Sequence, residues 1–177
     1  KTNSQTPVKS TLPLEYSEET SDEEFANFEM ILGQTVHQGL AWLTTNEHAD
    51  LKILKSLIQK WSANRYSEKE LIDELEQKTY EHISRTLNSN GGQWILKQRE
   101  DHKSEYGMTG VINGSIQRIF VDRMFVENKL RWIIDYKTGT PLTNLEPDTF
   151  YQTQIDLYKN QLERYQYIAK NIYSEPI

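Results

Sequence analysis

The sequence predicts an α+β fold, with N-terminal helices, a central sheet that is mostly antiparallel or mixed, and a C-terminal helix. Three observations support this prediction. Apolar residues recur at helical spacings of three and four in the first half of the chain; a period of two replaces this pattern from about residue 94; and a helical period returns from residue 149. With 177 residues, the chain is long enough for one domain with its own hydrophobic core.

The N-terminal part is predicted to be an arm followed by a helix. Residues 1–20 are polar and contain two prolines, so we expect a linker or disordered arm, with 21–177 forming a single domain. A capping box that starts at Ser21 predicts a helix to about Thr44. Gly33 lies within its apolar pattern, which indicates either close packing against a neighbour or a break in the helix.

The remaining helices are read from the same periodicity. A second helix is expected over 49–61, and a third over 67–87, which opens with a second capping box at Ser67 and ends in the Gly-rich segment 88–92. After the strands, 138–147 is expected to be a loop. A final helix is expected from Thr149 to about Ile172.

Four segments are predicted to be strands because their apolar residues alternate: 94–97, 105–108, 114–126 and 130–137. The last two form a hairpin. With Asn128–Lys129 as a two-residue loop, counting back along both strands places Asp122 opposite Asp135. Two carboxylates that face each other repel, so a cation is expected between them. Lys137 follows two residues later on the same strand face, and two acids with one lysine are the pattern of a magnesium-dependent phosphodiesterase site.

The loop length decides how strong this argument is. A loop of two or four residues keeps Asp122 and Asp135 paired, whereas three or five residues shift the pairing by one, which a bulge could restore. The alternative is an ordinary hairpin with exposed charges. Asp135 fits that alternative poorly, since it follows Trp-Ile-Ile in an apolar strand where a free carboxylate is costly.

Bulk properties restrict the class of protein. The net charge of −6 argues against a protein that coats nucleic acid, although it is compatible with a nuclease whose metal site is acidic. The chain has no cysteine, which excludes disulfides and thiolate metal sites and favours a reducing, cytoplasmic setting. No apolar run approaches the ~20 residues of a membrane span. The first residue is Lys1 rather than Met, as expected of a fragment of a longer protein.

Three motifs occur in order: Gly33–Leu40 with His37, the hairpin with Asp122 and Asp135–Lys137, and Gln161–Tyr165. Together they resemble the RecB-like nuclease domain, a branch of the PD-(D/E)XK superfamily with a restriction-endonuclease-like fold. In that family, this domain closes the C-terminus of AddA- and RecB-type helicase–nucleases and of related UvrD-like proteins. The resemblance covers roughly residues 25–170 as an ordered set of motifs.

The resemblance implies roles for individual residues. Asp122 and Asp135 correspond to the metal-binding carboxylates, and His37 to the histidine of the first helix that completes the metal shell. The backbone carbonyl of Tyr136 corresponds to a further metal ligand. Lys137 corresponds to the lysine that orients the attacking water or stabilises charge on the phosphate.

Further roles follow from the same resemblance. Gln161 and Tyr165 correspond to the family's QxxxY motif, which supports the active site and contacts DNA. Gln154 and Tyr158 make a second QxxxY two helical turns earlier, so both pairs fit one helix face. The Gln161 pair is closer to the family's form. Glu105 precedes the hairpin, where members of the family often place a possible additional acid.

One position departs from the family. Its first acid is often written Gly-x-Ile-Asp, and here Gln117 occupies the place of that Asp, with Asp122 five residues later. We prefer Asp122, since it pairs with Asp135 across the hairpin; a metal at Gln117 would imply an impaired site. Three strand arginines are further candidates for phosphate contacts, with none singled out: Arg118, Arg123 and Arg131.

The sequence therefore predicts a Mg²⁺-dependent deoxyribonuclease, an exonuclease or endonuclease, with Mn²⁺ as a possible substitute. The resemblance implies an exodeoxyribonuclease V-like helicase–nuclease of DNA recombination and repair. Its partners would be single-stranded DNA, the helicase domain of the same chain and partner subunits, with no membrane. One alternative is an inactive domain of the same fold that binds DNA or braces a helicase. Another is an interaction module with no role on nucleic acid.

Overall fold

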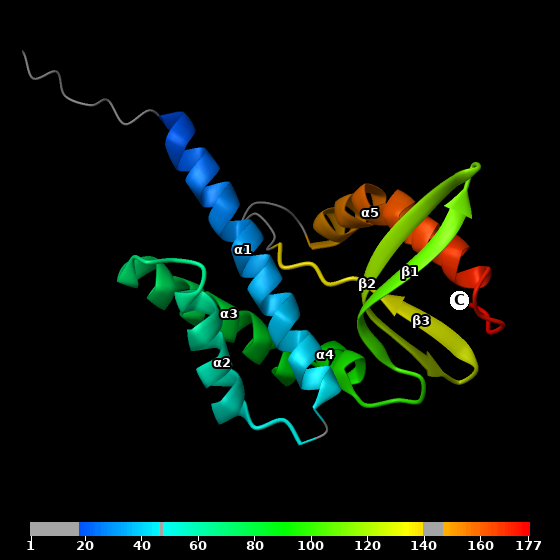
Figure 1. The fold of residues 1–177 in the computed structure, drawn as a ribbon, viewed down its shortest axis with the longest axis horizontal. Coiled ribbons are helices and arrows are strands. Elements are labelled where there is room, and N and C mark those ends of the chain that lie inside the picture. The colour runs from blue at the N-terminus through cyan, green and yellow to red at the C-terminus, as the bar shows by residue number, and fades with distance from the viewer. Residues whose placement is uncertain (1–17, 47, 140–146) are drawn as a thin grey trace, which may run out of the picture.

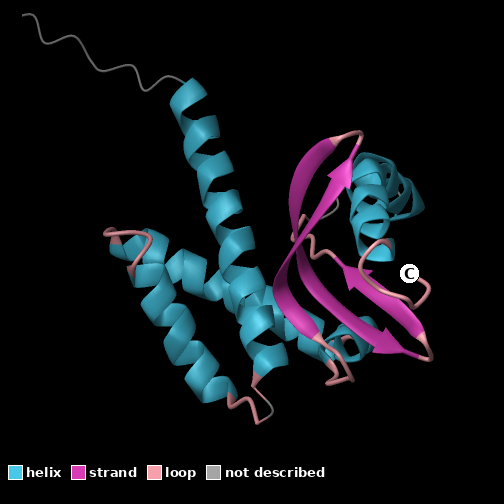
Figure 2. Ribbon diagram, turned by 45° about the vertical axis from the view of Figure 1, so that its right-hand side comes forward, coloured by secondary structure: helices cyan, strands magenta, loops and turns pink. Residues whose placement is uncertain are grey.

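Helices precede a three-stranded sheet, and a final helix follows it. The computed structural model describes residues 18–46, 48–139 and 147–177. The elements are α1 (Glu18–Thr45), α2 (Leu51–Ala63), α3 (Lys69–Asn88), α4 (Asn90–Leu96), β1 (Lys103–Ile112), β2 (Ser115–Glu127), β3 (Leu130–Ile134) and α5 (Pro147–Lys170). The antiparallel sheet has the order β1-β2-β3 and lies between α1 and α5 (Figures 1 and 2). The predicted α+β class is confirmed.

Helix α1 differs from its prediction at the N-terminal end. It begins at Glu18, so Ser21 lies inside the helix and the predicted capping box is wrong. The predicted arm otherwise lies outside the described residues. Gly33 does not break α1; a Cβ atom there would lie 3.4 Å from Oγ1 of Thr138, which means that the chain after β3 passes close to the helix at this point. The close-packing interpretation of Gly33 is therefore the correct one.

The starts of the next two helices also depend on capping. Asp50 caps α2, because its Oδ1 accepts a hydrogen bond of 2.7 Å from the backbone N–H of Lys52. The predicted capping box at Ser67 is wrong, since α3 begins at Lys69 after Glu68, whose side chain makes no capping hydrogen bond.

Among the described residues, no helix combines the length and apolar character that crossing a membrane requires.

The predicted strand over 94–97 is helix α4. Ser89 caps this helix, and its Oγ accepts a hydrogen bond of 3.0 Å from the N–H of Gly92. A short apolar run fits a buried helix as well as a strand, and here the capping serine decides. At the other end of the sheet, β3 stops at Ile134, so 135–137 follow the strand rather than belong to it. Most of the predicted loop lies outside the described residues.

Two tight turns set the register of the sheet. Asn113–Gly114 joins β1 to β2 with φ values of 50° and 77°, and Asn128–Lys129 joins β2 to β3 with φ values of 53° and 64°. Two successive residues with positive φ form the type I′ turn, whose twist matches that of the flanking strands. The predicted two-residue loop at Asn128–Lys129 is therefore confirmed.

Two hydrophobic cores stabilise the fold. The first joins α1, α2 and α3 through the buried side chains of Phe28, Leu32, Val36, Leu40, Leu54, Ile58, Leu75 and Ile83. The second joins the sheet to α5 through Met108, Ile119, Val121, Met124, Tyr165, Ile168 and Ala169. One core lies on the helical side of the molecule and the other between the sheet and α5, so α1 and the sheet adjoin each other between the two cores (Figure 2).

Two of the three candidate arginines are structural. The side chain of Arg123 is fully buried and donates a hydrogen bond of 2.8 Å to the carbonyl oxygen of Lys97. Arg131 is 2% exposed and lies 2.7 Å from a carboxylate oxygen of Asp101. Neither guanidinium can reach a bound phosphate in this arrangement. Arg118 remains exposed on β2.

The adjacent glycines of α4 provide a matched test of this packing. A Cβ atom at Gly92 would lie 1.9 Å from the backbone oxygen of Thr86, whereas at Gly91 it would meet nothing within 4 Å. We expect Gly92→Ala to destabilise the protein by about 1–3 kcal/mol through overpacking. Gly91→Ala should instead stabilise it by up to about 1 kcal/mol, through helix propensity. Denaturant unfolding followed by circular dichroism measures both changes, and equal shifts in the two variants would contradict this account.

Candidate metal centre

Three carboxylates meet at one row of the sheet, Glu105 and Asp122 within their strands and Asp135 just after the end of β3. In the β1–β2 ladder, the pairs on either side of the row place Glu105 opposite Asp122. In the β2–β3 ladder, the last pair is Arg123 with Ile134, so the next step places Asp135 beside Asp122 as well. Neighbouring strands are about 4.8 Å apart, and carboxylates facing each other at this spacing repel.

The ladder is interrupted at this row on both sides. Glu105 is missing from the register of paired residues and has a φ of 49°, in the left-handed region that a residue other than glycine rarely adopts. Strand β3 ends one residue before Asp135. Because Asp135 lies outside the strand, the alternation of side chains along a strand does not determine its direction. Within the strand, that alternation would have placed it on the same face as the carboxylate of Asp122.

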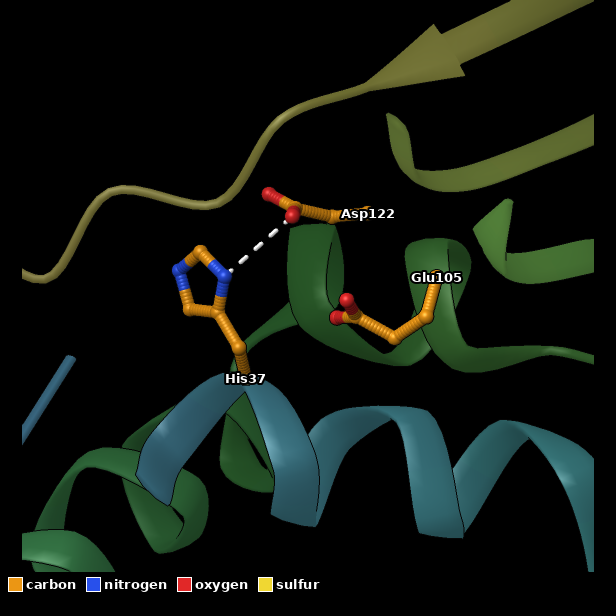
Figure 3. Close-up of side chains that lie close together, drawn as sticks. All are labelled: His37, Glu105 and Asp122. Carbon is orange, nitrogen blue, oxygen red and sulfur yellow. Dashed lines mark ion pairs between the residues drawn. The ribbon is translucent and has the colours of Figure 1, made fainter. Parts of the chain in front are cut away.

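Helix α1 contributes a histidine to the same place. Nδ1 of His37 lies 3.2 Å from Oδ1 of Asp122, and both side chains are largely buried, at 26% and 14% exposure. Figure 3 shows the imidazole ring and the carboxylates of Asp122 and Glu105 pointing toward one another. Three elements that are distant in sequence thus converge on one point.

The charges around this point are unbalanced. Burial lowers the pKa of His37, but its hydrogen bond with Asp122 and the negative charges of Asp122, Glu105 and Asp135 outweigh that effect and leave the pKa raised. The pKa of Glu105 is also raised, first by desolvation of its carboxyl group and then by the charge of Asp122. The negative charge of Asp122 contributes to both shifts, and a cation bound here would relieve that part of them.

The donor set fits a divalent cation. One ligand atom each from His37, Glu105 and Asp122 can be chosen so that all lie within 4.8 Å of one another. Carboxylate oxygens are the hard ligands that Mg²⁺ and Mn²⁺ prefer, and an imidazole nitrogen is acceptable to Mn²⁺. Three protein ligands leave coordination positions for water and for a substrate oxygen. These residues would hold either ion.

Asp135 faces a different set of partners. Nζ of Lys137 lies 2.6 Å from its Oδ2, and Nε2 of Gln161 donates to its Oδ1 at 3.2 Å. The same amide donates to the hydroxyl of Tyr165 at 2.5 Å. Oδ2 of Asp135 is buried, and the ammonium group of Lys137 is the cation that faces it.

The two QxxxY pairs of α5 share one face of the helix. Gln154, Tyr158 and Gln161 are half-buried and Tyr165 is buried, whereas most of the residues between them are exposed. The ring of Tyr158 lies 3.9 Å from Nζ of Lys137, at cation–π distance. Tyr158 of the first pair therefore contacts the lysine, and Gln161 of the second contacts Asp135.

Tyr136 joins the two halves of the site. Its backbone N–H donates to Oδ2 of Asp122 at 2.5 Å, and its ring packs edge-on against the ring of His37, with centroids 5.5 Å apart. Burial, which outweighs the opposing charge of Arg123, raises the pKa of Tyr136 well above its ordinary value, so the phenol stays neutral. The role predicted for its backbone carbonyl as a metal ligand stays a prediction.

Gln117 lies away from this site. It pairs with Gly110 in the sheet, and Asp122 follows five residues further along β2, which is about 17 Å at the usual strand rise. An odd separation also places the two side chains on opposite faces. The residue beside His37 is therefore Asp122.

Sequence reasoning gave Glu105 too little weight. It paired Asp122 with Asp135 across the second hairpin and treated Glu105 only as a possible additional acid. The missing signal was Asn113–Gly114, since Asn-Gly between alternating residues is the strongest short-range sign of a hairpin. Counting back from that turn places Glu105 opposite Asp122.

Comparison with known proteins identifies the family. Residues 12–175 match the model of the family described as the PD-(D/E)XK nuclease superfamily. Comparisons with curated proteins and with solved structures give no match. The family match spans nearly the whole chain and includes every residue of the metal centre described above. The chain belongs to the PD-(D/E)XK nuclease superfamily.

Proposed function

We propose that this domain is a divalent-metal-dependent deoxyribonuclease that hydrolyses phosphodiester bonds at the site between α1, the sheet and α5. The observation that carries the proposal is the convergence of His37, Glu105 and Asp122 within 4.8 Å, next to the ion pair of Asp135 with Lys137. An inactive brace would have no need of a repelling carboxylate pair beside an oriented lysine.

The residues of the metal centre hold and orient the cation. Asp122 is fixed on both oxygens, since Oδ1 faces His37 and Oδ2 accepts from the N–H of Tyr136. The Tyr136 ring packs on His37 and restricts the tilt of the imidazole. A divalent cation, when bound, supplies Lewis acidity for phosphodiester hydrolysis. Rigid ligands of this kind fix where that acidity acts.

Lys137 would bring positive charge to the phosphate. Its ammonium group is held between Oδ2 of Asp135 and the ring of Tyr158, at 2.6 Å and 3.9 Å. The side chain is 37% exposed, so a substrate can reach it. A cation oriented in advance stabilises the negative charge that develops on the phosphate without reorganisation during the reaction.

Gln161 and Tyr165 act as positioning residues. The amide of Gln161 donates both to Asp135 and to the hydroxyl of Tyr165, so it links the carboxylate to a residue of the second core. Tyr165 is 7% exposed, which leaves its ring to packing rather than to substrate. Through this chain of contacts α5 sets the position of Asp135, and Asp135 in turn sets Lys137.

We further propose the narrower assignment implied by the motifs. The ion is Mg²⁺, with Mn²⁺ able to replace it, and the substrate is single-stranded DNA. The domain would be the nuclease part of a RecB-like helicase–nuclease that acts in DNA recombination and repair, with the helicase delivering the strand. The order of the His37, Asp135–Lys137 and Gln161–Tyr165 motifs supports this assignment.

Cleavage of a labelled linear single strand tests the reaction. We expect degradation with Mg²⁺ or Mn²⁺ and none with EDTA. Lys137→Ala should slow it by roughly 10²–10³-fold, the usual loss when one group that stabilises transition-state charge is removed. Asp122→Asn should slow it at least as much, because a cation ligand and the partner of His37 are lost together.

Gln117→Ala is the matched control for this assay. It changes the position that the family's sequence pattern offers for the first acid but that lies away from His37 in the sheet. Its cleavage rate should equal that of the wild type. A loss in Gln117→Ala comparable to that in Asp122→Asn would show that the metal lies elsewhere, and metal-independent cleavage would refute the proposed chemistry.

Calorimetric titration with Mn²⁺ tests the role of Glu105 directly. We expect Glu105→Gln to weaken binding by at least about tenfold, since even partners outside the ligand shell are worth 10–100-fold. Glu70→Gln, which removes the same charge from an exposed position on α3, should leave the affinity unchanged. Equal affinities for wild type and Glu105→Gln would exclude Glu105 from the ligand set.

A further inference from the structure

An open cavity adjoins the metal centre on the side of the helices. Its volume is about 350 Å³, within the range of small-ligand sites, and His37 and Glu105 form part of its wall. The rest of the wall is polar or small: Gln34, Gln38 and Ala41 of α1, and Arg65 from the turn after α2. None of the lining residues outside the metal centre has been given a role above.

The turn that carries Arg65 is anchored. The backbone N–H groups of Arg65 and Tyr66 donate to the carbonyl oxygen of Ser62 at 3.0 and 3.2 Å, and Ser62 is fully buried. The ring of Tyr66 stacks on Phe28 of the first core, with centroids 6.0 Å apart. The base of the arginine is therefore fixed beside α1, while its side chain is exposed.

The guanidinium group of Arg65 has no ion-pair partner among the residues that the structure describes, and the residue lines the cavity. By contrast, Lys137 is engaged by Asp135, and Arg123 is buried against a backbone carbonyl. An exposed arginine that lines a cavity next to a metal centre can present its fork of donors to phosphate oxygens.

We propose that Arg65, flanked by the amides of Gln34 and Gln38, is the phosphate-binding residue on the helical side of the metal centre. It holds a backbone phosphate of the DNA strand in a cavity that Lys137 does not line. Because His37 and Glu105 line the same cavity, a phosphate bound there lies next to the cation ligands. This inference rests on the nuclease function proposed above.

DNA binding in the absence of cleavage tests the proposal. Fluorescence anisotropy of a labelled single-stranded oligonucleotide, with phosphorothioate linkages and Mn²⁺, gives the affinity as a function of salt. Each phosphate contact contributes a slope of about −0.7 in log K against log [salt] for single strands. We expect Arg65→Ala to reduce the slope by about that amount and to weaken binding about tenfold. Arg65→Lys, which keeps the charge without the fork of donors, should recover the slope and part of the affinity.

Arg164→Ala is the charge-matched control, since Arg164 is exposed on α5 and lies outside the cavity. Its slope should equal that of the wild type, and calorimetry should give the same Mn²⁺ affinity for all three variants. A wild-type slope in Arg65→Ala, or an equal loss in Arg164→Ala, would overturn the role of Arg65 alone. A wild-type protein that binds neither Mn²⁺ nor DNA would overturn the proposed nuclease function together with it.

Discussion

Repulsion among the carboxylates of Glu105, Asp122 and Asp135 is the constraint on which this site depends. The row of Glu105, Asp122 and Asp135 cannot continue as an ordinary ladder, because like charges face each other at strand spacing. Each acid is accommodated in a different way. Glu105 adopts a left-handed backbone conformation. Asp122 contacts His37 and accepts a hydrogen bond from a backbone N–H in the segment after β3, and Asp135 forms an ion pair with Lys137. The partners come from α1, from the segment after β3 and, through Gln161, from α5, so the acids link these three parts of the chain at the site.

Hydrophobic packing brings those elements close enough. The first core holds α1 against α2 and α3, and Gly39 lets α1 approach Ile83 so closely that a Cβ atom would lie 2.4 Å from its Cδ1. The second core holds α5 on the sheet, where Gly110 leaves room for Ile168 in the same manner. The polar site lies between the two cores because neither core could bury it.

The parts of this structure that were predictable from sequence are those with local causes. Asn128–Lys129 forms a two-residue turn, and the register of Asp122 in the second hairpin follows by counting from it. Asn113–Gly114 determines the register of Glu105 in the first hairpin in the same way. The errors have a different origin. The capping box at Ser21 was wrong because α1 extends beyond it, and 94–97 is helical because a cap at Ser89 competes with a weak strand pattern. Contacts between distant elements, such as Tyr158 with Lys137, have no local signal at all.

The same electrostatics explains how an acidic protein can bind an acidic polymer. With a divalent cation held between Glu105 and Asp122, the formal charges of this group cancel while His37 is neutral, and Lys137 already cancels Asp135. The site repels phosphate until the metal is bound, and is neutral afterwards. An unpaired cationic side chain at the edge of the neutral site then determines the sign of the local electrostatic potential. This holds although the chain as a whole has a net charge of −6. The proposed function therefore implies that metal and DNA bind cooperatively, each raising the affinity for the other by the same factor.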